Sequence, residues 1–435
     1  MTERRALKKL IRERMSRTGE SYTTARRQVL AKAGRADAPP LPAGIVPGYD
    51  TFGVESHRPS ALVVHVLRHL GTQHGEAMAA GLAGGVGFMY FVFDYTGMPP
   101  MMTIVAQHHP EPWAPAALGR LGVPLAEAHS SKPAPALKKL YAELDAGRPV
   151  LCTVDQSRLP WHGMLPGYGT DPYVVVVAGR EGDTLLVDDE ATQPSRIPAD
   201  QFAEAWSAHR KGRHHMLTPT GPPAATDLAA AVTDAIATTV AHLTGPVLGN
   251  NFDVNFGLSG MAKLAEQLRD GKAKTGWPRR FSEPVPLYHG LRRLYECLEL
   301  QLTAPGATRP LYAEFLSEAA AVLTRASDVL DEAAERFRRS GATWSRLAAR
   351  ALETVDSLGT YGELSERRME LTCSGTGTPD ELSALDERIG ALAGEYAAAD
   401  PLGEPGRRAL FDELATLVEE CHAEEREAVA LLAGV

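Results

Sequence analysis

Apolar and polar positions change their spacing near residue 222 of the chain. Before that point, short runs rich in β-branched residues predict strands at 148–155, 173–179 and 184–190, and the last two are expected to form a hairpin. A buried helix is expected from about residue 59 to residue 71, because its hydrophobic residues recur at helical spacing. Beyond residue 227 helical spacing continues almost throughout, which predicts a bundle of six to eight helices.

Basic and proline-rich segments divide the sequence into three parts. Residues 1–44 combine a basic arm, expected to hold two short amphipathic helices, with the proline-rich linker ADAPPLPAG. The breaker cluster TPTGPPAATD, at residues 218–227, marks the second boundary. We therefore expect an α+β domain over residues 45–222, followed by an all-α domain over residues 223–435.

The net charge of −9 is unevenly distributed. Residues 1–35 hold eleven Lys and Arg against three Glu, so the remainder carries −17. An acidic body attracts a cationic substrate, although acidity also serves solubility alone. The basic arm is expected either to dock a partner or to turn its charges to water. No apolar run approaches the roughly 20 residues that span a bilayer, and the polar N-terminus predicts a cytoplasmic location.

The spacing of potential ligand residues argues against a cofactor. The four cysteines are far apart and form no CxxC pair, so neither a disulfide framework nor a zinc finger is indicated. His65 and His69 stand at i, i+4, but no glutamate completes HExxH and no third ligand is evident. The adjacent pair His214-His215 is poorly suited to chelate one ion, and the glycines of residues 81–87 lack the GxxxxGK(S/T) phosphate loop. We therefore expect no cofactor and no metal.

Several stretches together resemble one known family. FGVESHRPSAL…GLAGGVGFMY and GRPVLCTVDQSRLPW…YVVVVAG…LLVDDE resemble the N-terminal domain of the butirosin-type acyltransferases. NFGLSGMAKLAEQL and TRPLYAEFLSEAAAVL are similar to the uncharacterised helical domain that usually follows it. The resemblance covers roughly residues 45–350. It implies a papain-like fold, related to the cysteine peptidases that process bacteriocin leaders, and transfer of an aminoacyl group from a carrier-protein thioester to an aminoglycoside amine.

The resemblance also implies where the active site lies and how it departs from the family. Family members place a Cys at a helix N-terminus, a His at the head of a central strand and an Asp or Asn on the next strand. The family dipeptide HC falls on Ser56-His57, so His57 stands at the cysteine position. Tyr173 stands at or beside the histidine position, and the acidic member survives as Asp188 or Asp189. Two substitutions argue against a covalent thioester intermediate.

The first hypothesis for this altered site is direct aminolysis of a thioester. Positioning the amine alone lowers a barrier by roughly 7–11 kcal/mol at the extreme, and a general base adds about 10²–10⁴-fold. His57 is the expected base, with Asp189, or Asp188, orienting its ring. Ser56 or Tyr173 is expected to donate a hydrogen bond to the developing oxyanion.

Two other hypotheses remain open. In the second, Ser56 is the nucleophile and His162, from the loop LPWHGMLPGYG, approaches as its base. In the third, the protein is a catalytically inactive homologue that binds a substrate or peptide, or acts as a scaffold. A peptide cyclase or an amide hydrolase in the same cleft is a further alternative.

Substrate contacts and partners complete the expectations. Residues expected to bind substrate are Glu55, Tyr90, Asp155, His162, Asp188 and Arg309. Arg309 would bind a carboxylate or a carrier phosphate, with a structural salt bridge as the alternative. The expected partners are an acyl carrier protein or a precursor peptide, and a cationic small-molecule or peptide substrate. No nucleic acid and no membrane is expected, and the helical half leaves a homodimer open.

Overall fold

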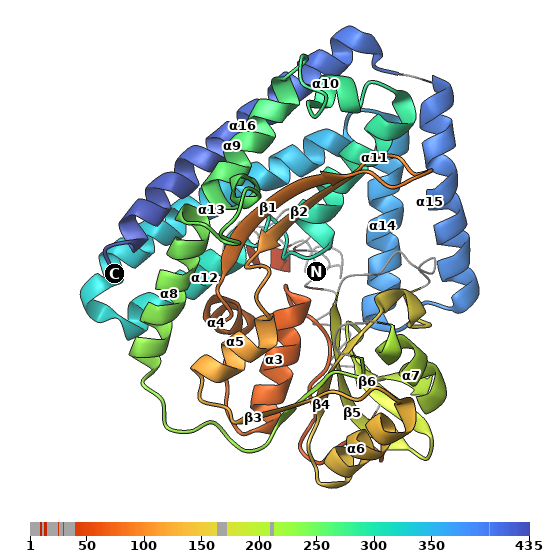
Figure 1. Cartoon of the computed structure of the whole chain (residues 1–435), viewed down its shortest axis with the longest axis vertical. Coiled ribbons are helices and arrows are strands. Elements are labelled where there is room, and N and C mark those ends of the chain that lie inside the picture. The colour runs from red at the N-terminus through yellow and green to blue at the C-terminus, as the bar shows by residue number, and fades with distance from the viewer. Residues whose placement is uncertain are drawn as a thin grey trace.

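Figure 1 shows the fold of the chain in a computed structural model. The structure describes residues 40–162, 172–208, 213–399 and 401–435, together with Lys9, Leu10, Glu13, Arg14, Ala25 and Val29. Most of the two helices expected in the basic arm, and the part of the loop LPWHGMLPGYG beyond His162, therefore lie outside the described residues.

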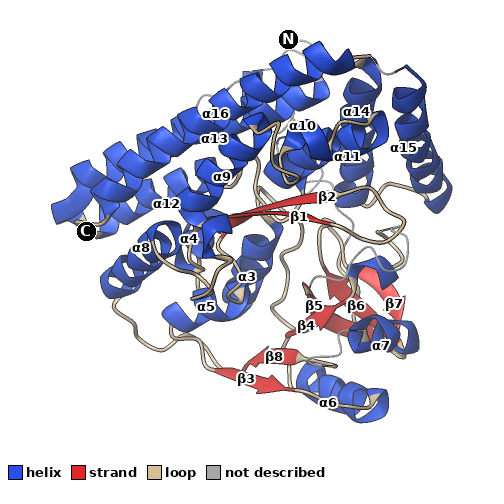
Figure 2. Ribbon diagram, turned by 45° about the horizontal axis from the view of Figure 1, so that its top comes forward, coloured by secondary structure: helices blue, strands red, loops and turns tan. Residues whose placement is uncertain are grey.

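The N-terminal region is built on a six-stranded antiparallel sheet with the strand order β3-β8-β4-β5-β6-β7 (Figure 2). Its strands are β3 (Leu125–Ala128), β4 (Val150–Val154), β5 (Tyr173–Glu181), β6 (Thr184–Asp188), β7 (Ser195–Pro198) and β8 (Met216–Pro219). Helix α3 (Arg58–His69) contacts β5, with α4 (Glu76–Leu82) and α5 (Trp113–Arg120) packed beside it. Helices α6 (Pro133–Asp145) and α7 (Ala199–Ser207) contact the sheet from its other side (Figure 1).

Buried β-branched residues explain the central strands. Val175, Val176 and Val177 of β5 are fully buried, because helices cover both faces of the sheet at this strand. Strands β5 and β6 form the predicted hairpin, which closes at the pair Glu181–Thr184 with Gly182 at a φ of 60°. The strands predicted in this region are thus confirmed, and the fold is the expected mixture of a sheet-containing N-terminal region with a helical C-terminal region.

A separate two-stranded sheet joins the two regions. Strands β1 (Val86–Phe93) and β2 (Met101–Gln107) pair antiparallel and extend from the end of α4 toward the helical region (Figures 1 and 2). They pack against α9 (Gly257–Arg269) and α11 (Pro284–Tyr295). This sheet therefore belongs by sequence to the first half of the chain and by packing to the second.

The helical region contains nine α-helices within the residues described from 213 onward, against six to eight predicted. Besides α9 and α11 these are α8 (Leu228–Thr244), α10 (Trp277–Arg280), α12 (Arg309–Val322), α13 (Ser327–Leu352), α14 (Asp356–Ser374), α15 (Pro379–Ala399) and α16 (Gly403–Leu432). The very short α10 accounts for part of the difference. In α13, the buried residues Leu330, Phe337 and Trp344 recur at helical spacing and face α12 and α16.

Two hydrophobic cores hold the fold together. The first joins α3, α4, α5 and the six-stranded sheet to α8, α12 and the end of α16, so it includes residues on both sides of position 222. The second joins β1 and β2 to α9, α11, α13 and the remaining helices. The expected domain boundary at 222/223 stays a prediction. Across the described ranges, the helices are all too short or too polar to traverse a bilayer.

Candidate functional site

The turn before α3 is held by one buried carboxylate. Glu76, on α4, accepts backbone N–H bonds from Glu55 (2.7 Å), Ser56 (2.7 Å) and His57 (2.8 Å). Burial raises the pKa of Glu76, while the backbone bonds act in the opposite direction. Because these three N–H groups are already bound, the turn cannot offer them to a developing oxyanion without losing Glu76.

His57 is buried at the start of α3. Its residue is 1% exposed, and its ring meets the edge of Trp113 at a centroid distance of 4.9 Å. Nδ1 bonds to the hydroxyl of Ser60 (2.8 Å), and Nε2 bonds to Oε1 of Gln107 (2.7 Å). Burial lowers the pKa of His57 to about 4, despite the bond to Gln107. The imidazole is therefore neutral and has both nitrogens occupied by protein groups.

This geometry corrects the expected pairing of His57 with Asp189. Both oxygens of Asp189 are bound by other side chains, and the two ring nitrogens of His57 bind Ser60 and Gln107. The residue that reaches Asp189 from α3 is Arg58 instead. Its Nε lies 2.5 Å from Oδ1 of Asp189, and its guanidinium lies 3.6 Å from the ring centroid of Tyr173.

The Arg58–Asp189 pair is charged and largely shielded from water. Burial alone would lower the pKa of Arg58, but Asp189 and its neighbours hold it above its ordinary value. Burial would likewise raise the pKa of Asp189, but Arg58 and His162 hold it well below its usual range. A cation in the first turn of a helix is destabilised by the helix dipole, and the carboxylate of Asp189 offsets this cost for Arg58.

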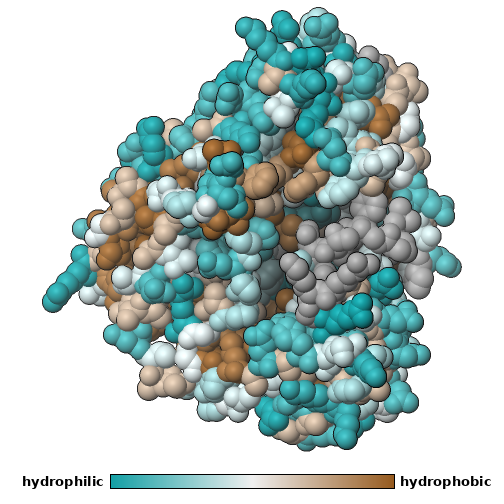
Figure 3. Space-filling model, viewed as in Figure 1, coloured by the Kyte–Doolittle hydropathy of each residue, from teal (hydrophilic) through white to brown (hydrophobic). Residues whose placement is uncertain are grey.

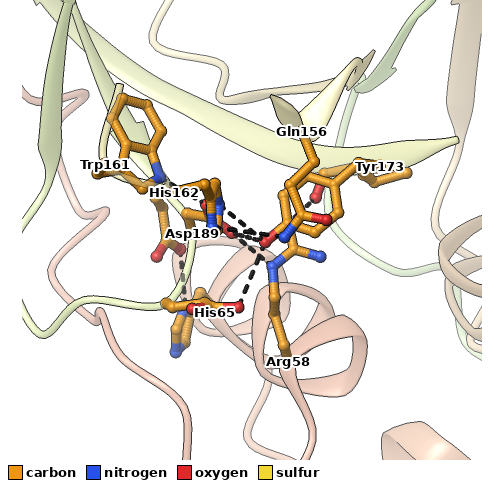
Figure 4. A network of polar contacts seen from close by, with 10 residues as sticks. Arg58, His65, Gln156, Trp161, His162, Tyr173 and Asp189 are labelled. Carbon is orange, nitrogen blue, oxygen red and sulfur yellow. Dashed lines mark hydrogen bonds and ion pairs between the residues drawn. The ribbon is translucent and has the colours of Figure 1, made fainter. Parts of the chain in front are cut away.

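Asp189 also orients His162, as Figure 4 shows. Nε2 of His162 lies 2.8 Å from Oδ2 of Asp189, and the indole N–H of Trp161 donates to the same oxygen at 2.8 Å. The hydroxyl of Tyr173 donates to Oδ1 at 2.9 Å. Among the residues that the structure describes, Nδ1 of His162 faces the amide of Gln156 at 3.4 Å, which is a long and weak contact. The structure thus contains a histidine–aspartate dyad, built on His162 instead of His57.

Asp188 points away from this dyad, as adjacent residues at the end of a strand do. Its Oδ2 accepts bonds from the hydroxyl of Tyr49 (2.5 Å) and from Nδ1 of His65 (2.7 Å), and the residue is fully buried. These bonds tie α3 and the segment before it to β6. Asp188 is therefore a structural residue, which corrects its expected role in substrate binding and leaves Asp189 as the acidic member of the site.

Two other residues expected to contact substrate are engaged within the protein. The hydroxyl of Tyr90 donates to Gln267 at 2.9 Å and accepts from Trp277 at 2.9 Å inside the second core. Asp155 caps the 3-10 turn Gln156–Arg158 through its bond to the Ser157 backbone. For these two residues the strand-core and capping roles replace the expected contact with substrate.

Arg309 takes the alternative role, a structural salt bridge. Its side chain is fully buried and binds both oxygens of Glu425, with Nε–Oε1 at 2.8 Å and Nη2–Oε2 at 2.7 Å. Its Nη1 donates to the carbonyls of Ala106 and Ala307, each at 2.7 Å. This corrects its expected contact with a carboxylate or a carrier phosphate, since the described donors already serve the protein.

The remaining expected residues surround the start of α3. Glu55 is exposed, and the hydroxyl of Ser56 accepts a bond from Nη2 of Arg14, a residue of the basic arm, at 2.9 Å. The structure therefore brings Tyr173, His162 and Asp189 together and keeps Ser56 on the turn that Glu76 holds.

Sequence reasoning missed Arg58, Glu76, Trp161 and Gln107. Two of them carried a usable signal: Arg58 is a cation at a helix start, which calls for an anionic partner, and Trp161 directly precedes His162. Glu76 and Gln107 gave none, because their partners are backbone amides and a histidine 50 residues away.

Two family models match the chain. Residues 57–190 match the model described as "Butirosin biosynthesis protein H, N-terminal", and residues 200–370 match "Domain of unknown function (DUF4872)". The first match begins at His57 and ends just after Asp189, so it contains α3 and the whole dyad, and it fits a papain-like fold. No curated protein matches the chain. The chain therefore carries a domain of the butirosin biosynthesis protein H N-terminal family, followed by a helical domain of the family of unknown function.

Proposed function

We propose that the protein is an acyltransferase-like enzyme of natural-product biosynthesis that forms an amide without a covalent acyl-enzyme. The name of its family, a butirosin biosynthesis protein, supports a role in antibiotic biosynthesis. The state of the cysteines argues against a thiolate nucleophile: Cys152, Cys297 and Cys421 are buried, and burial raises the pKa of each thiol. Cys373 is half-buried near the end of α14, and its carbonyl accepts a bond from the N–H of Thr192 at 3.1 Å.

The observation that carries the proposal is the bond from His162 to Asp189. With Nε2 bonded to the carboxylate, Nδ1 is the nitrogen that can accept a proton, once Gln156 moves from its long contact. An amine held beside Nδ1 attacks the thioester carbonyl and forms the C–N bond, while the C–S bond breaks and the proton passes through His162 to the leaving thiolate. Asp189 stabilises the imidazolium during the transfer.

The shape and the charge of the molecule suit a cationic acceptor and a carrier-bound donor. Figure 3 shows a hollow near the centre of this face, between the sheet-containing region below and the helical region above. The chain outside residues 1–35 carries −17, which favours a cationic amine by long-range attraction. Arg14, from the basic arm, contacts Ser56 at the start of α3, which supports docking of an acidic carrier protein beside the site.

A second candidate function is substrate binding without catalysis. The Arg58 guanidinium pairs with Asp189 and stacks on Tyr173 at the helix start where the family resemblance implies a cysteine. His162 is only 4% exposed. An inactive homologue would keep this ion pair closed and present the cleft to a ligand for another enzyme.

The proposal is tested by supplying an aminoacyl thioester of a carrier protein together with an amine acceptor. We expect amide formation with no acyl adduct on the protein by intact mass spectrometry. The variant His162→Gln should slow turnover by about 10²–10⁴-fold, whereas the control His422→Gln, a half-buried histidine on α16, should not. An acyl-protein adduct would contradict the mechanism. Saturable binding of amine or thioester without any turnover would favour the second candidate.

A further inference from the structure

A second group of ligand-type side chains lies at the opposite side of the six-stranded sheet. Strand β3 pairs with β8, with Glu127 opposite Leu217 and Ala128 opposite Met216. Continuing this register by one residue places His129 opposite His215, and their ring centroids are 4.9 Å apart. Strands β8, β4 and β5 separate β3 from β6, which leads into Asp189, so this group is distinct from the dyad.

The backbone places three ligand atoms on one face of the sheet. Glu127 lies on β3 and His129 directly follows its end, two residues further, so in a continued extended backbone their side chains emerge on the same face. Oε1 of Glu127 lies 3.0 Å from Nε2 of His215 and 3.3 Å from Nε2 of His129. Ligand atoms about 2.05 Å from a tetrahedral ion lie about 3.3 Å from one another, so an ion fits between them with small rotamer changes. One ligand atom from each residue lies within 4.8 Å of the other two.

A neighbouring hydroxyl holds the ring of His215 in the orientation that a metal ligand needs. Oγ1 of Thr153, on the adjacent strand β4, lies 3.0 Å from Nδ1 of His215 and leaves Nε2 directed at Glu127. Such a bond to the far ring nitrogen is typical of histidine ligands. His214 does not take part, because its Nδ1 bonds to the carbonyl of Ser130 at 2.7 Å.

We propose that Glu127, His129 and His215 bind one divalent transition-metal ion of the zinc type. Two imidazole nitrogens and one carboxylate oxygen form a ligand set that zinc accepts, and a set of three leaves a coordination position for water or an external ligand. The side chains of Glu127 and His129 are 60% and 53% exposed, so the ion reaches them from solvent. The sequence alone predicted no metal site, because Glu127 and His215 are 88 residues apart along the chain. Only the pairing of β3 with β8 brings them together.

The test uses tag-free protein treated with a chelator and then titrated with Zn²⁺ by calorimetry, with Co²⁺ absorption as a second probe. We expect one Zn²⁺ per chain, and a thermal stabilisation that depends on Zn²⁺ concentration. His129→Ala, which removes an exposed ligand without opening the core, should weaken binding at least about 10-fold and abolish the stabilisation. Thr153→Val, which keeps all three ligands, should weaken binding about 10-fold.

The control is His422→Ala, which leaves the group intact and should bind Zn²⁺ like the unaltered protein. Two results would overturn the assignment. The first is an unaltered protein without saturable Zn²⁺ binding, and the second is Zn²⁺ binding of equal affinity and stoichiometry in His129→Ala.

Discussion

The substitution Glu425→Ala should lower the free energy of unfolding more than any surface substitution on the same helix, α16. Four side-chain donors converge on its carboxylate: Nε and Nη2 of Arg309, the hydroxyl of Ser340 at 2.6 Å and the indole N–H of Trp344 at 2.9 Å. Arg309 and Glu425 are both 0% exposed. Because Arg309 also holds the carbonyl of Ala106 at the end of β2, the pair links α12 and α16 to the sheet that bridges the two halves.

The size of the effect follows from what Glu425→Ala leaves behind. A buried cation without its partner costs about 3–5 kcal/mol of unfolding free energy. The lost bonds to Ser340 and Trp344 are worth about 1 kcal/mol each, but they share the carboxylate of Glu425 with Arg309, so their contributions do not simply add to that cost. We therefore expect Glu425→Ala to lower the free energy of unfolding by about 4 kcal/mol in total. The double variant Arg309→Met/Glu425→Leu should lose less, because it leaves no unpaired buried charge.

The assay is urea denaturation followed by circular dichroism and by tryptophan fluorescence, and coincidence of the two curves tests two-state behaviour. Glu419→Ala is the matched control, since Glu419 lies on α16 and pairs with Arg269 in side chains that are 54% and 36% exposed. It should cost about 0–1 kcal/mol. Equal losses in Glu425→Ala and Glu419→Ala would refute the argument that burial makes this ion pair decisive.

Three further predictions concern the surroundings of the site and the cores. Glu76→Ala should cost at least about 2 kcal/mol and should speed hydrogen exchange in the turn before α3, whose amides the carboxylate binds; unchanged exchange there would contradict it. Gly81→Ala should lower the free energy of unfolding by about 1–3 kcal/mol in urea denaturation, because the added Cβ would lie 2.1 Å from the ring of Phe315. The control Gly119→Ala, which has open space around it, should be neutral or stabilising. Equal effects of the two substitutions would argue against tight packing of Gly81 on Phe315. Burial lowers the pKa of His242 to about 4, so the unfolded chain takes up a proton below pH 6.5 that the folded one resists, and stability present above that pH falls as pH decreases. Between pH 7.5 and 5.0, the free energy of unfolding should fall by about 2 kcal/mol less in His242→Gln than in the unaltered protein. Parallel plots of unfolding free energy against pH for the two proteins would contradict this.

Much of the architecture could be predicted from the sequence because it follows from local periodicity. The hairpin of β5 and β6 and the long helices α13 and α16 each bury residues at their own repeat, so a short window contains the signal. The packing of β1 and β2 on α9 and α11 could not be predicted in this way, because it depends on contacts between residues far apart in sequence.

The site was less predictable because single side-chain directions decide it. Asp188 and Asp189 were equivalent in the sequence, and both contact α3: Asp188 bonds to His65, whereas Asp189 bonds to Arg58. His57 fell at the family's cysteine position, yet its ring turns toward Gln107, which no local pattern indicates. The resemblance located the helix start correctly, while the identity of the histidine paired with the aspartate needed the tertiary structure.

The most direct test of the account is the tautomer of His162, measured by nitrogen-15 NMR of the imidazole at neutral pH and assigned with His162→Gln. We expect a proton on Nε2, donated to Asp189, and a lone pair on Nδ1, which is the nitrogen that must accept the proton of the attacking amine. A proton on Nδ1 of neutral His162, with Nε2 unprotonated, would contradict the proposed base and leave only the binding role for this cleft.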